Sequence, residues 1–444
     1  MSKETTPEPE AAKLAGRGSD SEAARPESTG GEKQPDGEVV LDAAPDGGLQ
    51  AWLVVLGSWC VLFCSFGWIN SIGTFQNYYE QGPLSSYSAS TVAWIPSLQI
   101  FFMYAMGPIP GYVFDHYGPR HLLAIGSLLH VFGLMMASLS TEYYQILLSQ
   151  GVVSAIGVSL IFQPANSVIP SWFDKKRGAA YGIMTSGSSF GGVIFPIMIQ
   201  RLIASVGYGW AMRAAAFLIF GLLLVANLTI KSRTPPAPHQ LTKKELVQPF
   251  KDPDMMLLTW GFVLLTFGVF IPINFMVVEA VSTGVLTPDL GQYLIPIFNA
   301  GSLFGRLGAG ASADFFGPYN VFVGVCYLAG VVILALWIPA SSAAATIVFA
   351  VIFGFSSGAY VALAAPCVVQ ISPRQQIGYR VGLVFLFSSV AGLTTNPIAG
   401  AILAANNGTW VGVKVYAGVL TIAGTTLALG SRLYQSGPKL LAKY

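Results

Sequence analysis

The chain has 444 residues, of which 53% are hydrophobic and only 10% are charged, with a formal net charge of +2. A soluble domain carries about 25% charged residues, so a chain this poor in charge lacks the polar surface that water requires and is expected to lie in lipid. Nucleic acid is excluded as a partner because the most charge-rich region, residues 1–46, is acidic.

The first 46 residues differ in composition from the rest of the chain. They carry eleven of the 21 acidic residues and five basic ones, with Pro, Gly, Ser and Ala between them. Such a segment cannot bury a core, so we predict a disordered cytoplasmic tail over 1–46. The tail has no apolar run and is therefore not expected to be a secretory signal.

Twelve apolar segments follow, each long enough to cross the roughly 30 Å apolar layer of a bilayer as a helix. The first six lie in an N-terminal half, 47–230, at 51–76, 91–113, 121–139, 144–166, 179–203 and 212–230. A cytoplasmic linker at 231–254, rich in Lys and Pro, precedes a C-terminal half, 255–431, with spans at 255–280, 288–312, 319–339, 344–368, 379–404 and 412–431. A short cytoplasmic tail, 432–444, ends the chain. The predicted fold class is an all-α membrane protein with twelve transmembrane helices in two pseudo-symmetric six-helix halves.

Basic residues in the predicted loops give the orientation. With the N-terminus in the cytoplasm, the inside loops and the C-terminal tail hold fourteen Lys and Arg residues, whereas the outside loops hold three, among them Lys414. Cytoplasmic loops of membrane proteins carry the excess of basic residues. We therefore predict a multi-pass membrane protein with both termini in the cytoplasm, and we expect it in the plasma membrane.

One loop pattern occurs twice. Gly111-x3-Asp115-x2-Gly118-Pro119 returns as Gly310-x3-Asp314-x2-Gly317-Pro318, with every member shifted by 199 residues. Each copy lies between two long apolar segments, which indicates duplication. A hydrophobic chain of two related halves is typical of a transporter, because the halves can rock against each other around a central site.

This pattern resembles the loop between the second and third helices of the major facilitator superfamily. The resemblance implies that the glycines allow close helix contact and that the acidic residue latches the two halves on the cytoplasmic side. The gate residues carried over are Gly111, Asp115, Gly118, Arg120, Asp314 and Gly317. The superfamily's Asp-Arg pair is Asp115-His116 here, and the second copy ends without a base, so we expect a weak or asymmetric latch.

Two further stretches resemble the monocarboxylate transporter family of that superfamily, most closely its fungal members. The stretch from Asp46-Gly47-Gly48-Leu49 to Trp52 is similar to the signature that enters helix 1, with Leu49 replacing its first aromatic residue. The stretch from Trp172-Phe173 to Gly182 is similar to the signature that leads into helix 5. The resemblance, over about residues 45–435, implies a secondary active transporter that moves a small organic solute, expected to be a carboxylate, by alternating access.

Arg306 is the first candidate for a substrate ligand. It lies inside the eighth predicted span, where a charge is costly and usually faces a cavity or a partner. Guanidinium binds carboxylate through two parallel hydrogen bonds, and the residue 199 positions earlier is Gly107, so the halves differ here. In monocarboxylate transporters an Arg at this position is the carboxylate ligand. The alternative is an Arg whose side chain snorkels to the membrane surface.

Other polar residues in the spans are weaker candidates for the substrate site, because such groups also hold helices together. Asn299 and Ser302 lie seven and four residues before Arg306, on the same helix face. The remaining candidates are Asn70, Gln163, Asn166, Asn274 and Tyr360. Glu279, in the seventh span, is interpreted either as a proton carrier or as a residue of the outer rim.

Two positions depart from the monocarboxylate pattern. The family has an Asp four residues before its helix 8 Arg, where this chain has Ser302, and its mammalian members have a Lys in helix 1, where this chain has Asn70. Symport of a proton with lactate therefore cannot be carried over intact. The alternative function is efflux of a bulkier fungal secondary metabolite.

The sequence shows no catalytic set, metal cluster or nucleotide-binding motif, so we expect neither enzyme activity nor a cofactor. The four cysteines lie in apolar runs and are predicted to be buried thiols without disulfide partners. The expected partners are a small-molecule substrate that is an organic anion, protons as the candidate coupling ion, and the lipid bilayer.

Overall fold

A computed structural model of the chain describes residues 44–233 and 242–437, which form helices and loops with no β-strand among them. Most of the predicted N-terminal tail, residues 1–43, and residues 438–444 of the predicted C-terminal tail lie outside the described residues. The four cysteines are buried and unpaired, as predicted. The all-α prediction is confirmed.

The first half contains six spans, several of them built from more than one helical piece. Its elements are α1 (Leu49–Leu62), η1 (Phe63–Gly67), α2 (Ile72–Gln81), α3 (Ala89–Val92), α4 (Trp94–Ala105), α5 (Pro108–Tyr117), α6 (Arg120–Ala137), α7 (Tyr143–Ile146), η2 (Leu147–Ser154), α8 (Ala155–Val168), η3 (Ile169–Ser171), α9 (Arg177–Val206) and α10 (Tyr208–Thr229).

The second half repeats this order after the linker elements α11 (Lys243–Val247) and η4 (Gln248–Phe250). Its elements are α12 (Pro253–Ser282), α13 (Pro288–Gly291), α14 (Leu294–Phe316), α15 (Pro318–Val332), η5 (Ile333–Trp337), α16 (Ala343–Gln370), η6 (Arg374–Gln376), α17 (Ile377–Ala405) and α18 (Val411–Ser436). The seventh span thus begins within the predicted linker, and the last continues past the predicted boundary at 431.

Eleven of the twelve predicted spans are helices both long and apolar enough to cross a membrane. The twelfth is α14, which has 23 residues and is less apolar because it carries Arg306 and Asp314. The described helices therefore agree with the predicted twelve-helix architecture.

Two of the early spans are interrupted, and each break has a local cause. In the first span the π-helix η1 precedes Asn70 and Ser71, which leave the helix. The Asn70 side chain donates to the Phe66 carbonyl oxygen at 3.0 Å, so this backbone acceptor keeps a partner within the membrane. The second span breaks at Gly107, directly before Pro108, whose ring nitrogen has no hydrogen to donate to the preceding turn.

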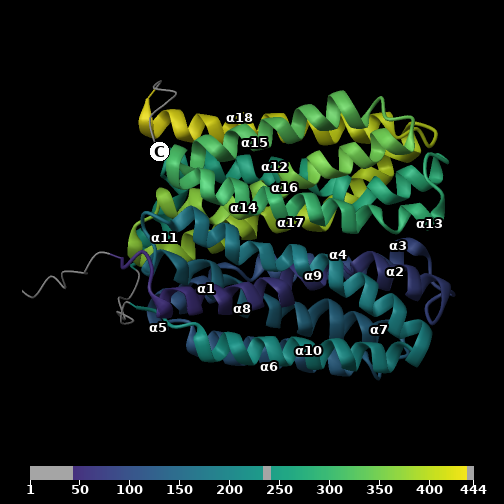
Figure 1. The fold of residues 1–444 in the computed structure, drawn as a ribbon, viewed down its shortest axis with the longest axis horizontal. Coiled ribbons are helices and arrows are strands. Elements are labelled where there is room, and N and C mark those ends of the chain that lie inside the picture. The colour runs from purple at the N-terminus through teal and green to yellow at the C-terminus, as the bar shows by residue number, and fades with distance from the viewer. Residues whose placement is uncertain (1–43, 234–241, 438–444) are drawn as a thin grey trace, which may run out of the picture. The chain divides into compact units, whose positions relative to one another are not determined.

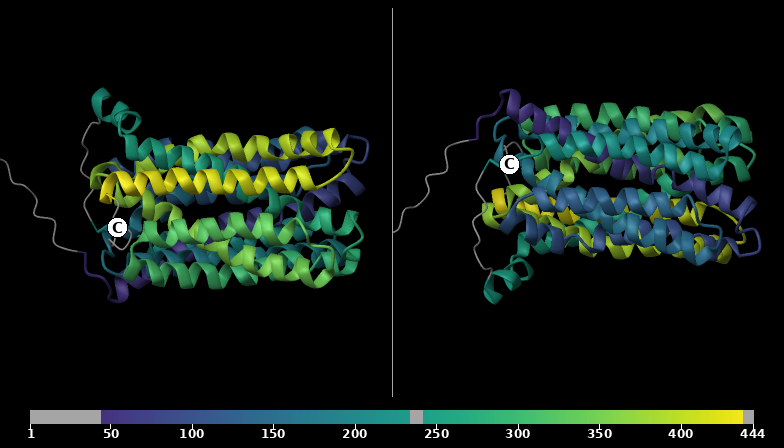
Figure 2. Two further views of the ribbon diagram at one scale, coloured as in Figure 1. Left: turned by 90° about the horizontal axis from the view of Figure 1, so that it is seen from above. Right: turned by 90° about the horizontal axis from the view of Figure 1, so that it is seen from below.

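Each half has its own hydrophobic core, and the halves meet along two interfaces. Within the first half α1 packs on α9 and α10, and within the second half α12 packs on α17 and α18. Between the halves, α9 packs against α14, and α4 and α5 pack against α17 (Figure 1). The spans of both halves run alongside one another in two further views (Figure 2).

The beginning of α1 and the end of α18 lie at the same end of the helices, together with α5 and α11 (Figure 1). We call this end the motif end, because the repeated loops with Asp115 and Asp314 lie here. The opposite end is called the far end.

Candidate functional site: the interface between the two halves

The two copies of the loop motif cap helices of the opposite half. The Asp115 carboxylate accepts hydrogen bonds from the Gly378 and Tyr379 N–H groups, both at 2.9 Å, at the start of α17. The Asp314 carboxylate accepts hydrogen bonds from the N–H groups of Gly178 and the next residue, at 2.6 and 2.9 Å, at the start of α9. A helix N-terminus has unpaired N–H groups and the positive end of the helix dipole, so a carboxylate is stabilising there. The halves thus hold each other at the motif end.

Glycine makes the close approach of these helices possible. A Cβ atom on Gly111 would overlap the carbonyl oxygen of Gly378, and one on Gly310 would lie 2.5 Å from the carbonyl oxygen of Gly178. Any side chain at Gly111 or Gly310 would therefore force the two backbones apart.

The caps have the same geometry in both copies, whereas the degenerate motif led us to expect a weak or asymmetric latch. Arg120 is exposed and forms no hydrogen bond with a described residue, and the second copy has no base at all. The helix N-termini need only a carboxylate, so the lost basic residues leave both caps intact. Gly118 and Gly317, which end α5 and α14, have φ values of 75° and 86°, which glycine adopts without strain.

The two stretches that resemble the monocarboxylate family meet each other just before α9. Asp46 Oδ1 accepts hydrogen bonds from the backbone N–H groups of residues 174–176, at 2.7, 2.7 and 3.2 Å. The Asp46 N–H donates to the Trp172 carbonyl oxygen at 3.1 Å. Trp52 packs edge to face against Phe173, with ring centroids 5.1 Å apart. Apart from the two resemblances themselves, no pattern in the sequence predicted this contact.

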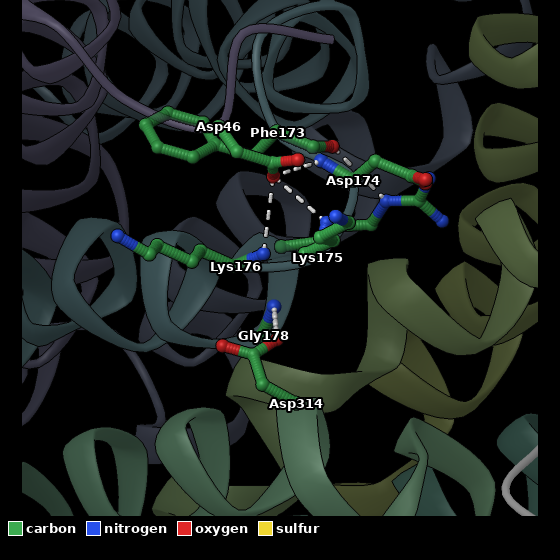
Figure 3. A network of polar contacts seen from close by, with 8 residues as sticks. Asp46, Phe173, Asp174, Lys175, Lys176, Gly178 and Asp314 are labelled. Atoms are coloured by element: carbon green, nitrogen blue, oxygen red, sulfur yellow. Dashed lines mark hydrogen bonds and ion pairs between the residues drawn. The ribbon is translucent and has the colours of Figure 1, made fainter. Parts of the chain in front are cut away.

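Two carboxylates therefore approach the start of α9 from different parts of the chain. Asp46 reaches the preceding loop from one side, and Asp314 reaches Gly178 from the other (Figure 3). Burial raises the pKa of Asp46, but the three N–H donors outweigh it and hold the pKa below the ordinary value of 3.8. Asp46 is thus charged at neutral pH.

Arg306 reaches from α14 to α9 in the other half. Its Nε donates to Ser302 Oγ at 3.1 Å, while Nη1 donates to the Thr185 carbonyl oxygen at 2.8 Å and to Ser188 Oγ. The residue is only 5% exposed, so its side chain does not snorkel to the membrane surface. Nη2 forms no hydrogen bond with a described residue, and no described carboxylate pairs with this guanidinium.

Three other predicted substrate residues lie near Arg306 at the α9–α14 interface. Ser302 accepts from Arg306, and Asn299 donates to the Gly192 carbonyl oxygen at 3.4 Å. A Cβ atom on Gly192 would lie 2.8 Å from Nδ2 of Asn70, which places Asn70 beside the same glycine. The structure therefore brings these residues together in one region.

The remaining predicted residues do not join that region. Asn166 donates to the carbonyl oxygen four residues earlier in its own helix, at 2.9 Å, and Asn274 donates to Asn396 of the same half at 2.8 Å. Gln163 is fully buried, and neither of its amide atoms has a hydrogen-bond partner. Tyr360 lies near the second interface, where it lines a cavity.

This cavity lies between the halves and is small, with a volume of about 10 Å³, which is room for about one water molecule. Tyr104 of α4 lines it together with residues of α12, α16 and α17, among them Phe262, Thr266, Tyr360, Phe385 and Ser388. Sequence reasoning identified only Tyr360, since hydroxyl and aromatic residues are common in apolar spans. The missed signal is an alignment of α9 with α17, which pairs Ser188 with Ser388 at a shift of 200 residues.

Glu279 lies near the far end of α12, but it is buried and paired rather than exposed at a rim. Its carboxylate forms an ion pair with Lys414 Nζ at 2.6 Å, and Trp337 Nε1 donates to its second oxygen at 3.2 Å. Lys414, which the loop count assigned to an outside loop, lies within α18 and is only 4% exposed. The pair joins the first and last spans of the second half.

Comparison with known proteins agrees with this architecture. Residues 54–285 match the family model described as the Major Facilitator Superfamily. The chain is 56% identical over 414 residues to the protein of Aspergillus flavus named MFS transporter asaE, covering 93% of each chain. It is 50% identical over 433 residues to the Fujikurins efflux protein of Gibberella fujikuroi, covering 96% of this chain and 93% of that relative.

A solved structure with low sequence identity shows the same fold. The fucose:proton symporter FucP of E. coli matches with a TM-score of 0.67 at 15% identity, covering 85% of this chain and 98% of its own. The matching model, the close relatives and the twelve-helix fold together show that this chain belongs to the major facilitator superfamily of membrane transporters.

Proposed function

We propose that the protein exports a small secondary metabolite by alternating access between its two halves, and that Arg306 binds an anionic group of this cargo. Export is supported by the relative named as an efflux protein for fujikurins, which is similar over nearly its whole length. The anionic group is supported by the chain's own geometry at the α9–α14 interface.

The observation that carries the proposal is a buried positive charge without a carboxylate. Two other buried cations have one: Lys414 pairs with Glu279 at 2.6 Å, and Arg380 pairs with Asp252 at 2.7 Å. Arg306 contacts only hydroxyl and carbonyl oxygens. A charge inside a membrane span is costly unless it is paired or functional, so an anion from outside the chain is the natural partner.

The same guanidinium also links the two halves, so cargo binding and the link compete. A carboxylate offers two charged oxygens to the guanidinium, and these hydrogen bonds are stronger than those to the neutral oxygens of Thr185 and Ser188. An arriving anion therefore displaces α9 from Arg306 and loosens this interface. In this way binding energy is used to move the halves.

The described arrangement is closed at the motif end. Its two aspartate caps join α5 to α17 and α14 to α9 at this end. Further along the described part of α9, residues 185–192 form hydrogen bonds with α14. We place the motif end and both termini in the cytoplasm and the protein in the plasma membrane, on the basis of the predicted loop charges. Cargo from the cytoplasm then enters only after the Asp115 and Asp314 caps release.

A second candidate function is proton symport with a carboxylate, as in the monocarboxylate family. The contact between the two resembling stretches at Asp46 favours this assignment. Against it, the groups that touch Arg306 belong to Ser302, Thr185 and Ser188, none of which exchanges a proton near neutral pH. The direction of flux and its response to a pH gradient separate the two functions.

Transport by the full-length chain in lipid vesicles tests the proposal. Labelled 2,4-dihydroxybenzoate serves as a probe that carries a carboxylate, and its flux is measured with and without a pH gradient. Hydrogen bonds to a charged group contribute about 1.5–3 kcal/mol, so Arg306→Gln should lower the apparent affinity about tenfold to a hundredfold.

The matched control is Arg213→Gln, which also removes one positive charge. Arg213 contacts Ser138 and the Trp210 ring, away from the interface between the halves. Its variant should transport as the unmodified protein does. Equal affinity for the probe in Arg306→Gln and the unmodified protein, at equal insertion, would contradict the assigned role of Arg306.

A further inference from the structure

The linker between the halves combines exposed positive charges with exposed apolar side chains. Its sequence from position 243 is Lys-Lys-Glu-Leu-Val-Gln-Pro-Phe-Lys, and these residues form α11 and η4. Lys243, Lys244 and Lys251 are exposed, and so are Val247 and Phe250, at 47% and 43%. We call these five residues the linker surface. A mixture of basic and apolar side chains is typical of a surface that lies on a membrane.

The acidic residues next to these lysines have other partners. Glu245 accepts hydrogen bonds from the Thr242 N–H and hydroxyl groups, at 2.7 and 2.8 Å, in a capping box at the start of α11. Asp252 forms its ion pair with Arg380 at 2.7 Å. None of the three lysines of the linker surface forms an ion pair with a described residue. The positive charge of this surface is therefore left without an anion from the described part of the chain.

Two contacts with α17 fix the linker surface at the motif end. The Tyr379 hydroxyl donates to the Leu246 carbonyl oxygen at 3.2 Å, and the ion pair of Arg380 holds Asp252, the residue directly before α12. The N–H of Tyr379 donates to the Asp115 carboxylate, so the linker lies beside the α5–α17 cap. The lysines are thus presented from a defined position.

Aromatic rings continue the linker surface onto the membrane-crossing helices. Phe250 packs against Phe387 of α17, with ring centroids 6.2 Å apart, and Phe387 packs against Trp260 of α12, with centroids 6.0 Å apart. Trp260 is 48% exposed and lies about 10 Å along α12 from its start at Pro253. Exposed aromatic residues gather where the apolar layer of a bilayer meets the headgroups. This row places Phe250 at that level, so the adjacent Lys251 lies among the headgroups.

The linker also lies to the side of the spans. Figure 2 shows α11 and η4, in teal, outside the lateral edge of the helices at the motif end in both views. A segment in that position has lipid headgroups beside it when the chain spans a membrane. Basic segments next to a span are attracted to anionic lipids, which bind about fivefold more tightly for each Lys near the surface.

From the juxtaposition of three unpaired lysines with this aromatic row, we propose that the linker surface binds the headgroup of an anionic phospholipid. The charged oxygens of the headgroup pair with Lys243, Lys244 and Lys251, while Val247 and Phe250 contact the upper part of the acyl chains. No assumption about cargo enters, since this surface requires only that the chain spans a membrane.

Contact quenching of fluorescence in lipid nanodiscs tests this lipid site. A single fluorophore is attached to the full-length chain through Gln248→Cys, an exposed position between the lysines, since the four native cysteines are buried. The bilayer is phosphatidylcholine with a small fraction of one spin-labelled lipid, either phosphatidylserine or phosphatidylcholine. At low ionic strength the labelled phosphatidylserine should bind at least about tenfold more tightly. Salt at about 1 M, where the Debye length is about 3 Å, should remove most of this preference.

A pair of lysine substitutions in the linker, with a matched pair elsewhere, locates the preference. Lys243→Gln with Lys244→Gln should lower the preference for phosphatidylserine about tenfold to twentyfold. The control is Lys175→Gln with Lys176→Gln, which removes two adjacent exposed lysines at the motif end of the other half. The control pair should leave the preference unchanged.

Four outcomes would overturn the lipid site. Equal quenching by the two labelled lipids in the unmodified linker would show that the headgroup charge is not recognised. An unchanged preference in the linker pair would exclude its lysines as ligands, and an equal loss in both pairs would mean that only the overall charge of this end matters. Weak quenching by both lipids would place the linker away from the bilayer and favour a soluble acidic partner instead.

Discussion

The α9–α14 interface and the α5–α17 interface begin alike at the motif end and differ two turns further into the membrane. Each begins with an aspartate that caps a helix of the other half, and each continues with glycines in close contact. Beyond these, Arg306 of α14 bonds to α9 at the first interface, whereas Gly107 packs directly against Gly382 of α17 at the second. The two interfaces thus share the carboxylates and glycines that join the halves, and they differ at the position of Arg306, for which we propose a role in binding cargo.

The two halves also differ in the charge of the buried polar groups near the far end. In the first half, the Tyr79 hydroxyl donates to Gln150 at 2.6 Å and lies 3.0 Å from the Tyr208 hydroxyl, which joins α2 to α10. In the second half the buried ion pair of Glu279 and Lys414 joins α12 to α18. Both networks connect the first and last spans of their half, one without charge and one with it.

The largest expected effect is the loss of stability in Glu279→Gln. This change leaves Lys414 buried without its carboxylate, which should destabilise the folded protein by about 3–5 kcal/mol. The corresponding change in the first half, Tyr79→Phe, removes only neutral hydrogen bonds and should cost about 1 kcal/mol. Thermal unfolding of the purified variants in detergent measures both.

A double variant, Glu279→Leu with Lys414→Met, provides the control. It removes both charges and should recover most of the lost stability, because apolar residues of similar volume replace a buried pair well. Equal losses in Glu279→Gln and Tyr79→Phe would show that charge does not distinguish the two halves in this way.

The next effect concerns the glycines at the crossing points. Gly111→Val and Gly310→Val each place a side chain against the backbone of the opposite half, and overpacking of this kind costs about 1–3 kcal/mol. The closed arrangement should lose population by about 5- to 150-fold in each variant. Distances between spin labels on α5 and α17, and on α9 and α14, report the separation.

Gly324→Val is the matched control, since a Cβ atom there meets nothing within 4 Å. It should leave both distances unchanged. If Gly111→Val opens the halves and Gly310→Val does not, then the two interfaces are unequal even where their caps agree.

The sequence was sufficient for the architecture because lipid imposes a simple rule. Apolar length predicted the spans, and the repeated motif predicted the two halves. The helix break before α2 was missed, because a π-helix leaves the mean hydropathy of the span unchanged. Lys414 was misplaced for a related reason: its charge suggests a loop, whereas a buried carboxylate holds it within a helix.

The site was harder to predict because its geometry depends on the register between helices of different halves. The type of residue was enough to single out Arg306, but its contacts with Thr185 and Ser188 require the packing of α9 on α14. The roles of Asn166 and Asn274 in binding cargo remain predictions, and both bond within their own half. Ser388 has no distinctive sequence signal until α17 is aligned with α9.

A smaller effect is expected from the caps themselves. Asp115→Asn and Asp314→Asn each weaken a helix cap that the other half supplies, which should cost about 1 kcal/mol. Because the geometry is the same in both copies, the two variants should open the motif end about equally, by roughly fivefold. Accessibility of a cysteine placed at this interface to a water-soluble thiol reagent measures the opening.

Arg120→Gln is the control for the caps, since Arg120 forms no hydrogen bond with a described residue. It should leave accessibility unchanged. A large effect in Asp115→Asn with none in Asp314→Asn would restore the asymmetric latch that the degenerate motif suggests.

The smallest effect is expected at Asp46. This residue belongs to the same half as α9, and it accepts hydrogen bonds from the loop just before that helix. The backbone donors of residues 174–176 hold the pKa of Asp46 below 3.8, so the folded state favours the charged carboxylate. Its contribution to stability is therefore present above pH 3.8 and is lost as the pH falls through the lower pKa of the folded state. Amide hydrogen exchange in residues 172–178 should be faster in Asp46→Asn than in the unmodified chain near pH 7. After correction for intrinsic exchange, this difference should vanish in acid.

Asp174→Asn, which removes only the exposed pair with Arg177, should leave exchange at residues 175–176 nearly unchanged. A difference that persists in acid would mean that Asp46 acts through its backbone conformation rather than through its charge.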